Sequence, residues 1–372
     1  MDASLNKKLE EVKWGEHRIE DVLQWQSQKE IDPLKLEELK DETESVYPFY
    51  GQATINNGII SYHQLTNKVL NNKDGKPTIL IHSNNQNIVY LETPFYLKDG
   101  HGATSVLQSE KLNKLNQMFI IASIDKVIKN KYSYNTKATK IELKNTVISL
   151  PTKNGKVDFD FMTSFIAELE AGHISKLDAY LIATGLNDYT LTDEEQQVLQ
   201  EFENVNWGTF NLEKLFGKST RGKRLKSADR ISGNLPFVTA GESDEGVSAF
   251  IGNDVTIFSE NTTTIDMFGS AKYRNYKYGA DDHITVVHTE NLPKYASIFI
   301  TVAIHKSSHT GKFNYGRNFY PKDADELNIS LPIKNKEPNY EMMETFVSAI
   351  HKLVIKDVVM YANRKIDATK SI

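Results

Sequence analysis

Two long stretches of the chain carry apolar residues at intervals of three and four, the spacing that places side chains on one face of an α-helix. They span 161–181 and 342–361, and each follows a region of short β-type runs. Both apolar stripes are wide, and the simplest way to bury them is against each other as an antiparallel helix pair. Burial of each stripe in the core of its own domain is the alternative. The stripe residues expected to pair the helices and to contact a partner are Phe165, Leu169, Leu177, Phe346, Ile350 and Val354.

Shorter elements precede each of these two helices. A short amphipathic helix is predicted at 19–23 and again at 212–216. A further helix begins near Leu191, where Thr192 and Glu195 have capping-box spacing, and ends near Phe202. β-type runs separated by turn residues are predicted at 47–49, 58–62, 78–81, 105–107, 256–258 and 284–287. The pattern therefore predicts mixed domains with a mostly β core.

The order of these elements occurs twice in the chain. Trp14-Gly15 returns as Trp207-Gly208, an offset of 207 − 14 = 193, and Pro151 returns as Pro332, an offset of 332 − 151 = 181. An offset that drifts in a few steps is typical of a duplication with loops of unequal length. The expected fold is α+β, with two homologous β-rich domains joined by long helices packed as an antiparallel pair. The expected boundaries are 1–157 for the first domain, 158–203 for a spacer helix and connector, 204–337 for the second domain and 338–372 for a second spacer helix.

Composition is that of an ordinary soluble globular protein, with 39% hydrophobic and 25% charged residues. The chain has no cysteine, which excludes disulfides and thiolate metal sites. The N-terminal residues lack the apolar core of a signal peptide, and the longest apolar run, 298–304, is too short to cross a bilayer. The sequence therefore predicts a cytoplasmic protein without a membrane partner.

Charge is distributed differently in the two copies. The net charge of −5 argues mildly against nucleic acid as a ligand. However, 217–226 holds lysines and arginines without any acid, whereas the equivalent stretch of the first copy, 30–44, is mostly acidic. A basic loop in one copy could bind phosphate, because each neutralised phosphate releases counterions. A solvated, flexible loop is the alternative.

Motifs of the common enzyme classes are missing from the sequence. No phosphate-binding Gly-x-x-x-x-Gly-Lys-Ser/Thr loop is present, and the ten histidines are scattered. The run Asp281-Asp282-His283 suggests a metal cluster, but the matching segment of the first copy keeps one acid and His101 only. Three adjacent residues on a strand also cannot all face one ion. We therefore expect neither a catalytic residue nor a metal site in this chain.

The repeated motifs resemble a known family. In both copies a Trp-Gly pair and a short helix precede a Pro-aromatic strand, an Asn-Gly or Glu-Gly turn, a Ser-x-Asn phrase and a long helix. This order resembles the specificity subunits of bacterial restriction-modification systems over essentially the whole chain. The helix near Leu191 that leads into Trp207-Gly208 is more similar to BcgI-like (type IIB) subunits than to ordinary type I subunits. The first copy departs more, with its acidic insert and no basic loop.

The resemblance implies a non-catalytic subunit with two target recognition domains, each reading half of a bipartite double-stranded DNA sequence. The half-sites should differ because the two copies differ. The paired helices would dock a partner chain that carries methyltransferase and nuclease domains. S-adenosylmethionine and Mg²⁺ are expected in that partner, which flips the target adenine, and no cofactor is expected in this chain. The alternatives are a type I specificity subunit and, more distantly, a stand-alone nuclease or carbohydrate-active enzyme, or a pairing protein without DNA affinity.

Candidate DNA contacts follow from side-chain chemistry and position in the repeat, with 79–85 aligned to 255–261. Amide side chains pair bidentately with adenine. Lysine and arginine side chains interleaved with tyrosines suit contact with DNA phosphates. A turn between strands is the alternative for the asparagine cluster. The first-domain candidates are Asn84, Asn85, Gln86, Lys131, Tyr132 and Tyr134. The second-domain candidates are Asn261, Thr262, Thr263, Lys312 and Tyr315 at equivalent places, Arg221, Lys223 and Arg224 in the basic loop, and Lys272, Arg274 and Lys277.

Overall fold

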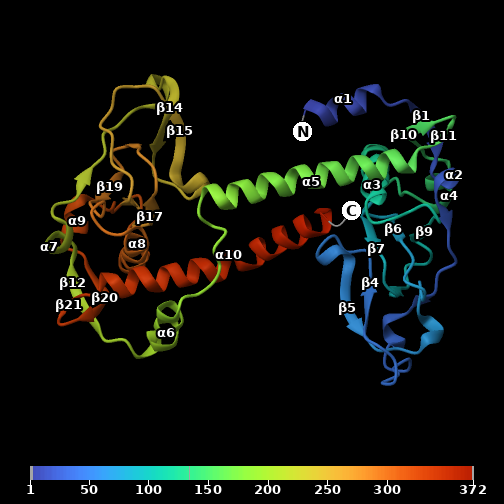
Figure 1. Ribbon diagram of the computed structural model, residues 1–372, viewed down its shortest axis with the longest axis horizontal. Coiled ribbons are helices and arrows are strands. Elements are labelled where there is room, and N and C mark those ends of the chain that lie inside the picture. Colours follow the sequence, from blue (N-terminus) through green and yellow to red (C-terminus); the bar gives the residue numbers. More distant parts are fainter. Residues whose placement is uncertain (1–2, 134, 371–372) are drawn as a thin grey trace. The chain divides into compact units, whose positions relative to one another are not determined.

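The computed structural model describes residues 3–133 and 135–370, leaving aside the side chains of 369 and 370. The chain forms two units, Met1–Lys176 with Ala368–Ile372 and Leu177–Asp367 (Figure 1). Each unit combines helices with three small sheets, which confirms the α+β class and the two β-rich domains. Within the described part of the chain, none of the helices has the length and apolarity needed to span a membrane.

The first unit begins with a helix and ends within the long helix α5, whose residues from Leu177 onwards belong to the second unit. Its elements are α1 (Ala3–Glu11), β1 (Trp14–Arg18), α2 (Ile19–Val22), β2 (Gln24–Trp25), β3 (Glu30–Ile31), β4 (Tyr47–Tyr50), β5 (Ile59–His63), β6 (Thr78–His82), β7 (Ile88–Leu91), β8 (Tyr96–Lys98), β9 (Thr104–Gln108), α3 (Asn116–Lys131), α4 (Lys140–Asn145), β10 (Val147–Lys153), β11 (Lys156–Val157) and α5 (Phe159–Ala183). Its sheets have the orders β2-β9-β6-β7, β3-β8-β4-β5 and β1-β10-β11.

The second unit repeats this arrangement, except that β3 has no counterpart there. Its elements are α6 (Asp193–Glu201), β12 (Trp207–Asn211), α7 (Leu212–Phe216), β13 (Thr220–Arg221), β14 (Ser232–Val238), β15 (Val247–Ile251), β16 (Thr262–Asp266), β17 (Ala271–Arg274), β18 (Gly279–Ala280), β19 (Ile284–Val287), α8 (Lys294–Ser308), α9 (Pro321–Asp325), β20 (Asn328–Lys334), β21 (Glu337–Pro338) and α10 (Tyr340–Lys370). Its sheets have the orders β13-β19-β16-β17, β15-β14-β18 and β12-β20-β21.

One alignment made from the sequence is wrong. In the sheet orders, β16 takes the place of β6, so 262–266 matches 78–82 with an offset of 262 − 78 = 184. The predicted strand at 256–258 is not one: Phe258 forms only an isolated bridge with Tyr278. The apolar pattern misled because Ile257 is 60% exposed, whereas the strand itself is rich in threonine and fully buried.

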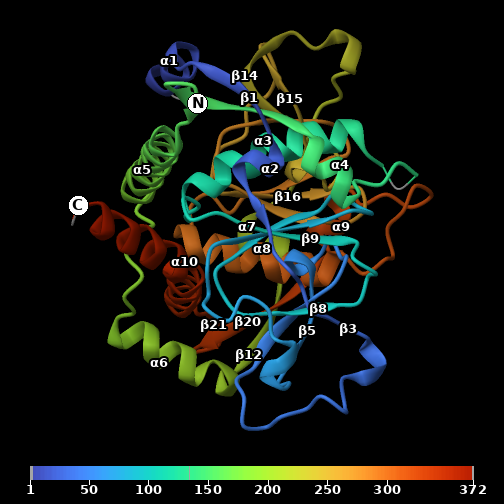
Figure 2. The ribbon, with the colours of Figure 1, turned by 90° about the vertical axis from the view of Figure 1, so that its right-hand side faces the viewer.

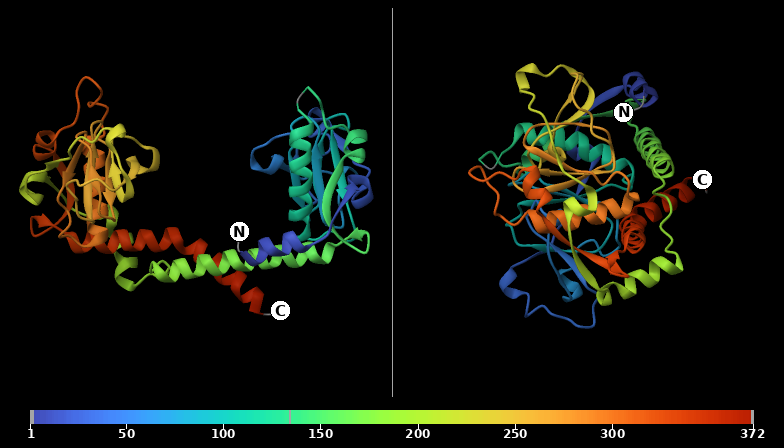
Figure 3. Two further views of the ribbon diagram at one scale, coloured as in Figure 1. Left: turned by 90° about the horizontal axis from the view of Figure 1, so that it is seen from above. Right: turned by 90° about the vertical axis from the view of Figure 1, so that its left-hand side faces the viewer.

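The core of each unit has three layers: a helix, a sheet and a second sheet. In β6, Ile79 and Ile81 pack towards Ile124 of α3, and Leu80 packs towards the second sheet. Successive strand residues face opposite sides of the sheet, so a strand between two apolar layers is buried along its whole length. Helix α3 covers one face of the sheet (Figure 2, Figure 3). In the second unit, Ile300 of α8 belongs to the corresponding cluster.

The repeated Trp-Gly and Leu-Pro motifs are partners in one antiparallel pairing. Trp14 lies opposite Pro151 in the β1–β10 ladder, and Trp207 lies opposite Pro332 in the β12–β20 ladder. A Cβ at Gly208 would stand 2.6 Å from Cγ2 of Ile333. The glycine after the tryptophan therefore lets the two strands approach. This pairing joins the beginning of each domain to the strand that leads into its long helix.

The first turns of each long helix pack inside their own unit. This is the alternative in which each apolar stripe is buried in the core of its own domain. Phe165 is buried against Leu5 of α1, and Leu169 lies in the same cluster. Phe346 of α10 stacks on Phe202, which follows α6, with ring centroids 3.8 Å apart. Helix α1 is not among the predicted elements, although it occupies the place in the first unit that α6 has in the second. The expected mutual burial of Phe165, Leu169 and Phe346 is therefore corrected.

The contact between the long helices is found further along. In the second unit, Leu177 and Leu181 near the end of α5 form a buried cluster with Ile355, Val359 and Ala362 of α10. This contact confirms the packed pair of long helices. Two other stripe residues of α10, Ile350 and Val354, are 39% and 74% exposed.

Candidate nucleic-acid interface

The first-domain amides Asn84, Asn85 and Gln86 lie in the turn between β6 and β7. Gln86 is buried, and its Nε2 donates to the carbonyl oxygen of Ser83 at 2.9 Å. Asn85 Nδ2 donates to the carbonyl oxygen of Gln52 at 3.2 Å, and Asn84 is half-buried. The turn interpretation therefore accounts for these residues. The structure does not present Asn85 and Gln86 as free amides.

The amides of this turn support a second turn, between β4 and β5. Asn87 Nδ2 donates to the carbonyl oxygen of Ala53 at 2.9 Å, beside the bond from Asn85 to Gln52. Two carbonyl groups of the β4–β5 loop are thus held by side chains of the β6–β7 turn. These two backbone acceptors of the loop are therefore satisfied within the protein.

Two of the three candidates after α3 can be placed. Lys131 is exposed at the end of α3, and its Nζ lies 5.1 Å from the ring centre of Tyr132. Tyr132 is buried, and its hydroxyl is 2.9 Å from Oγ1 of Thr146. Tyr132 is therefore not a contact to the DNA phosphate backbone, because its hydroxyl group is already hydrogen-bonded within the core. Tyr134 lies outside the described residues.

The second-domain residues that were predicted from their alignment to these amides are wrong, because the alignment of 79–85 to 255–261 is wrong. Thr262 and Thr263 are buried in β16, and Oγ1 of Thr263 is 2.6 Å from Oγ1 of Thr301. Asn261 Nδ2 donates to the carbonyl oxygen of Leu292 at 2.7 Å, and its Oδ1 accepts from the hydroxyl of Tyr273 at 3.0 Å. None of these three side chains is available to DNA in this structure.

Arg274, a predicted phosphate contact, is buried instead. It is 1% exposed, and its Nε donates to Oγ1 of Thr264 at 2.9 Å. Its Nη1 donates to the hydroxyl of Tyr276 at 3.0 Å, and its Nη2 donates to the carbonyl oxygen of Glu245 at 2.8 Å. Every part of the guanidinium therefore has a partner, which is what burial of a charged group requires. The last of these bonds supports the turn between β14 and β15.

Lys272 supports the same region. Its Nζ lies 3.2 Å from Oε1 of Glu242 and 3.0 Å from Oγ of Ser270. Hydrogen bonds from Ser270 and Lys272 hold the pKa of Glu242 below its ordinary value. Lys272 is thus committed to an ion pair. Of this group of candidates, Lys277 alone has an exposed side chain.

The basic loop is the best-supported part of the predicted surface. Its backbone is fixed: the amide of Gly222 donates to Ile284 O at 2.9 Å, and that of Lys223 donates to Ala280 O at 2.8 Å. A Cβ at Gly222 would overlap the carbonyl oxygen of Asp281. The side chains of Lys223 and Arg224 are exposed, with no partner among the described residues. A hydrogen-bonded backbone that carries exposed lysine and arginine side chains disfavours the alternative of a flexible loop.

Arg221 at the start of this loop is partly engaged. Its Nε donates to the carbonyl oxygen of Asp282 at 2.7 Å, and its Cζ lies 5.0 Å from the ring centre of Tyr320. The guanidinium is therefore oriented, and the side chain is still 47% exposed and accessible to a phosphate oxygen.

The Asp281-Asp282-His283 run organises the basic loop. These residues form a turn between β18 and β19, so the argument that placed them on a strand is wrong. One ligand atom from each can be chosen so that all lie within 4.8 Å of one another. However, Asp281 Oδ1 accepts from the amide of Leu225 at 3.2 Å, and Asp282 Oδ2 lies 3.7 Å from Nη2 of Arg221. Both carboxylates thus contact the basic loop. That the run holds no metal stays a prediction.

The last two candidates, Lys312 and Tyr315, lie on the connection between α8 and α9. Tyr315 is 86% exposed, and its ring meets that of Phe268 edge-on at 5.2 Å. Lys312 is exposed, with its Nζ 5.7 Å from the ring centre of Phe313. The structure leaves both side chains accessible for contact with a ligand.

A feature that was not among the candidates occurs in both units. The turns after β4 and β14 each contain three consecutive residues with positive φ. The values are 48°, 50° and 82° for Asn56, Asn57 and Gly58, and 48°, 56° and 82° for Asp244, Glu245 and Gly246. The matched Asn-Gly and Glu-Gly pairs in the sequence were the available signal. They indicated a turn but not its left-handed backbone.

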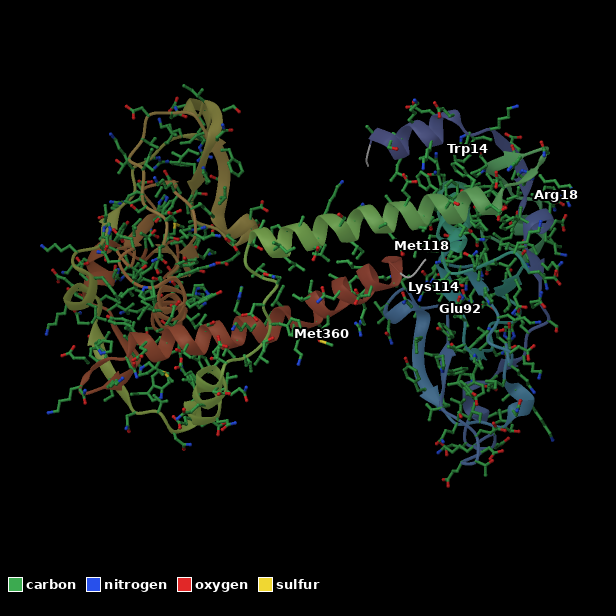
Figure 4. All side chains as sticks on the ribbon, in the orientation of Figure 1. Trp14, Arg18, Glu92, Lys114, Met118 and Met360 are labelled. Atoms are coloured by element: carbon green, nitrogen blue, oxygen red, sulfur yellow. The ribbon has the colours of Figure 1, made fainter. Side chains whose placement is uncertain are left out.

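An apolar groove of about 870 Å³ lies in the first unit, lined by Trp14, Met118, Phe119 and Phe165 among others. Trp14 and Met118 are labelled in Figure 4. Trp14 is 45% exposed, and Trp207 is exposed to the same extent in the second unit. Exposed indole rings at equivalent places are typical of surfaces that bind other proteins.

Comparisons with known proteins find the same duplicated organisation. The type I restriction modification DNA specificity domain matches residues 11–179 and again 204–360. The specificity subunit S.BcgI of a type II restriction enzyme from Heyndrickxia coagulans is 27% identical over 251 residues, covering 66% of this chain and 69% of that protein. A type I restriction-modification S subunit from M. genitalium has a similar structure, with a TM-score of 0.61 at 14% identity. That match covers 97% of this chain and 94% of the other, and at such identity it concerns the fold.

Proposed function

We propose that this chain, which belongs to the type I restriction modification DNA specificity domain family, reads a two-part asymmetric DNA site for a restriction-modification enzyme. Two target recognition domains, 1–157 and 204–337, would each read one part. The chain itself would carry out no reaction. S-adenosylmethionine and Mg²⁺ would be bound by a methyltransferase and nuclease partner.

The observation that supports this proposal most is one framework carrying two different surfaces. Both units have the same strand orders apart from β3, which has no counterpart in the second unit, and yet the exposed loop that follows the short helix differs in charge. In the second unit it presents Lys223 and Arg224, and in the first unit the corresponding 30–44 stretch is mostly acidic. Two related domains with unlike surfaces are suited to two unlike half-sites on one duplex, because base edges are read by side chains on such surfaces.

The partner would dock on apolar surface that the chain leaves exposed. Ile350 and Val354 of α10 belong to this surface, and Leu177 lies in the cluster that pairs α10 with α5. The groove beside Trp14 and the exposed ring of Trp207 are further candidates. Truncation of an exposed apolar side chain should weaken assembly with the partner without unfolding the chain, since Val354 is already 74% exposed.

A BcgI-like system, with methyltransferase and nuclease fused in one partner chain, is favoured over a type I system. The 27% identity to the S.BcgI subunit supports this choice, whereas the type I likeness concerns the fold. The reading frame beside the gene for this chain distinguishes the two systems. One fused partner supports the BcgI-like assignment, and separate modification and translocase chains would support type I.

The test is methylation mapping in a host that lacks its own DNA methylation. The chain is expressed with the product of the neighbouring reading frame, and the same host with the partner alone is the control. We expect methylated adenines at two short, unlike half-sites separated by a fixed number of unspecified bases. Methylation that does not depend on this chain, or a purified chain that itself cuts or modifies DNA or glycan, would refute the proposal.

A further inference from the structure

We propose that the two left-handed turns are the base-reading elements of the domains, with Asn56 and Asn57 reading one half-site and Asp244 and Glu245 the other. This inference depends on the proposed function, and it names the side chains that would carry the specificity.

The backbone of these turns is unusual in the same way in both domains. Two non-glycine residues in succession have positive φ, followed by a glycine at 82°. Asparagine and aspartate tolerate this conformation, but for Glu245, at a φ of 56°, it is unfavourable. A turn that served only to connect two strands could avoid this cost with glycine. Backbone strain of this kind concentrates at functional sites, where the surrounding structure maintains it.

The surrounding structure does maintain both turns, and it does so from equivalent places. In the first unit the support comes from Asn85 and Asn87, which donate to the carbonyl oxygens of Gln52 and Ala53. In the second unit it comes from Arg274, whose Nη2 donates to the carbonyl oxygen of Glu245 at 2.8 Å. The supporting side chains lie just before or within β7 and β17, the strands at one edge of equivalent sheets. The backbone of the turn is thus matched, while the supporting residues differ.

The side chains at the tips of the turns are free. Asn57, Asp244 and Glu245 are exposed and have no side-chain partner among the described residues. Asn56 Nδ2 makes one long bond, 3.3 Å, to the carbonyl oxygen of Ile59. Apart from that bond, the side chains at the tips keep their donors and acceptors for a ligand.

An exposed aromatic ring accompanies each turn in the same register. Tyr62 lies opposite Pro48 in the β4–β5 ladder, and Phe250 lies opposite Pro236 in the β14–β15 ladder. Their exposed fractions are 58% and 59%. In the second unit, Asp244 and Phe250 line one open pocket of about 610 Å³. A flat apolar ring beside a polar group suits a nucleobase, which offers an apolar face and a polar edge.

The chemistry of the two tips differs in a way that predicts different bases. Asparagine pairs bidentately with N6 and N7 of adenine, and aspartate or glutamate accepts from N4 of cytosine. Carboxylates repel the phosphate backbone, so at a DNA surface they suit base edges beside a basic phosphate-binding group. The basic loop is such a group: Lys223 bonds Ala280 of β18, which pairs with Val238 at the end of β14. We therefore expect an A·T pair under the first turn and a C·G pair under the second.

The test exchanges the two tips. The variant Asp244→Asn/Glu245→Asn keeps the left-handed backbone, because asparagine tolerates it well. The reciprocal variant is Asn56→Asp/Asn57→Glu. Each full chain is expressed with the neighbouring partner, and its half-sites are mapped by methylation. We expect the second half-site to lose its preference for C·G by about tenfold or more in the first variant, with the first half-site unchanged. The reciprocal variant should change the first half-site alone.

The matched control is Asp254→Asn/Glu260→Gln, which removes two exposed carboxylates of the second domain that are not part of the turn. It should leave both half-sites unchanged. If a tip variant melts at the wild-type temperature and still methylates the wild-type half-site at the wild-type preference, the turn does not read bases and this inference fails. If the wild-type chain directs no two-part methylation at all, it is the proposed function that fails.

Discussion

Strands β6 and β16 occupy the same place in the two units, and yet they are made of different side chains. Ile79 and Leu80 of β6 correspond to Thr263 and Thr264 of β16, and all four are buried. The hydroxyl groups are satisfied: Thr263 Oγ1 is 2.6 Å from Oγ1 of Thr301, and Thr264 Oγ1 accepts from Arg274 at 2.9 Å. These two strand positions are therefore filled either by apolar side chains or by threonines whose hydroxyl groups are hydrogen-bonded, because a buried polar atom needs a partner.

The largest effect should come from truncating the apolar version of this strand. Ile79→Ala is expected to lower the free energy of unfolding by about 2–5 kcal/mol, because it removes a packed side chain beneath α3 and leaves a cavity. The matched change Thr263→Ala should cost less, about 1–2 kcal/mol, since Thr301 keeps its bond to the carbonyl oxygen of Ser297 at 2.8 Å. Urea unfolding of both variants measures this. Equal losses, or a larger loss for Thr263→Ala, would contradict the comparison.

The end of the same strand predicts an acid sensitivity specific to one unit. His82 is fully buried, and burial lowers the pKa of its imidazole to about 4. Between the unfolded value of 6.5 and about 4, the unfolded chain binds a proton that the folded chain does not. Stability therefore falls as the pH is lowered through this window, by about 3 kcal/mol in all.

The measurement is the melting temperature of the first unit between pH 7 and pH 4.5, compared with the variant His82→Asn. The variant should lose that part of the pH dependence. The second unit has Asp266 in this place and no imidazole there. A pH dependence that is the same with and without the imidazole would show that His82 does not cause it.

The helices that pack on the two long helices are also held differently. In the second unit Glu195 of α6 is buried, with Lys352 Nζ at 3.0 Å and Ser348 Oγ at 2.7 Å. Burial raises the pKa of Glu195, but the bonds from Ser348, the Thr192 amide and Lys352 outweigh it and hold this pKa below 4.5. Glu195→Ala should cost about 1–3 kcal/mol at pH 7, and the cost should shrink as the pH falls below about 4.5.

The first unit offers the control for this change. Lys8 of α1 contacts Glu168 of α5, but these side chains are 46% and 43% exposed. Glu168→Ala should therefore change the free energy of unfolding by less than about 1 kcal/mol, because solvent screens an exposed pair. Chemical unfolding of both variants at pH 7 gives the two values. A control that costs as much as Glu195→Ala would show that burial does not set the difference.

The smallest effect in free energy is expected for the basic loop. Lys223→Ala/Arg224→Ala should weaken DNA binding by the assembled complex about tenfold, or about 1.4 kcal/mol. The slope of log affinity against log salt should fall by about 1.8, as for two lost phosphate contacts. Arg221→Ala tests the partly engaged member of the group. The matched change in the first unit, Lys35→Ala/Lys40→Ala, should leave the slope nearly unchanged. Equal slopes for wild type and the basic-loop variant would remove that loop from the interface.

The sequence was sufficient for the duplication, the long helices and the capped helix α6. These features depend on local signals: a 3.6-residue apolar period, and the spacing of Thr192 and Glu195, which forms the expected capping box. It was not sufficient for β16, because a strand of threonines has no apolar alternation to reveal it. Helix α1 was also missed, since its two inward leucines form too short a stripe to identify.

The candidate site divides in the same way. The run of lysines and arginines at 217–226 predicted an exposed basic loop, and this prediction is confirmed. A run without acidic residues has few ion-pair partners nearby in the chain. Residue type could not tell that Arg274 and Asn85 donate to backbone carbonyl groups rather than face solvent. Those partners are 29 and 33 residues away in the chain, so only the packing of one hairpin against another brings them together. Local chemistry is written in the order of the residues, whereas burial and partnership depend on contacts between distant segments.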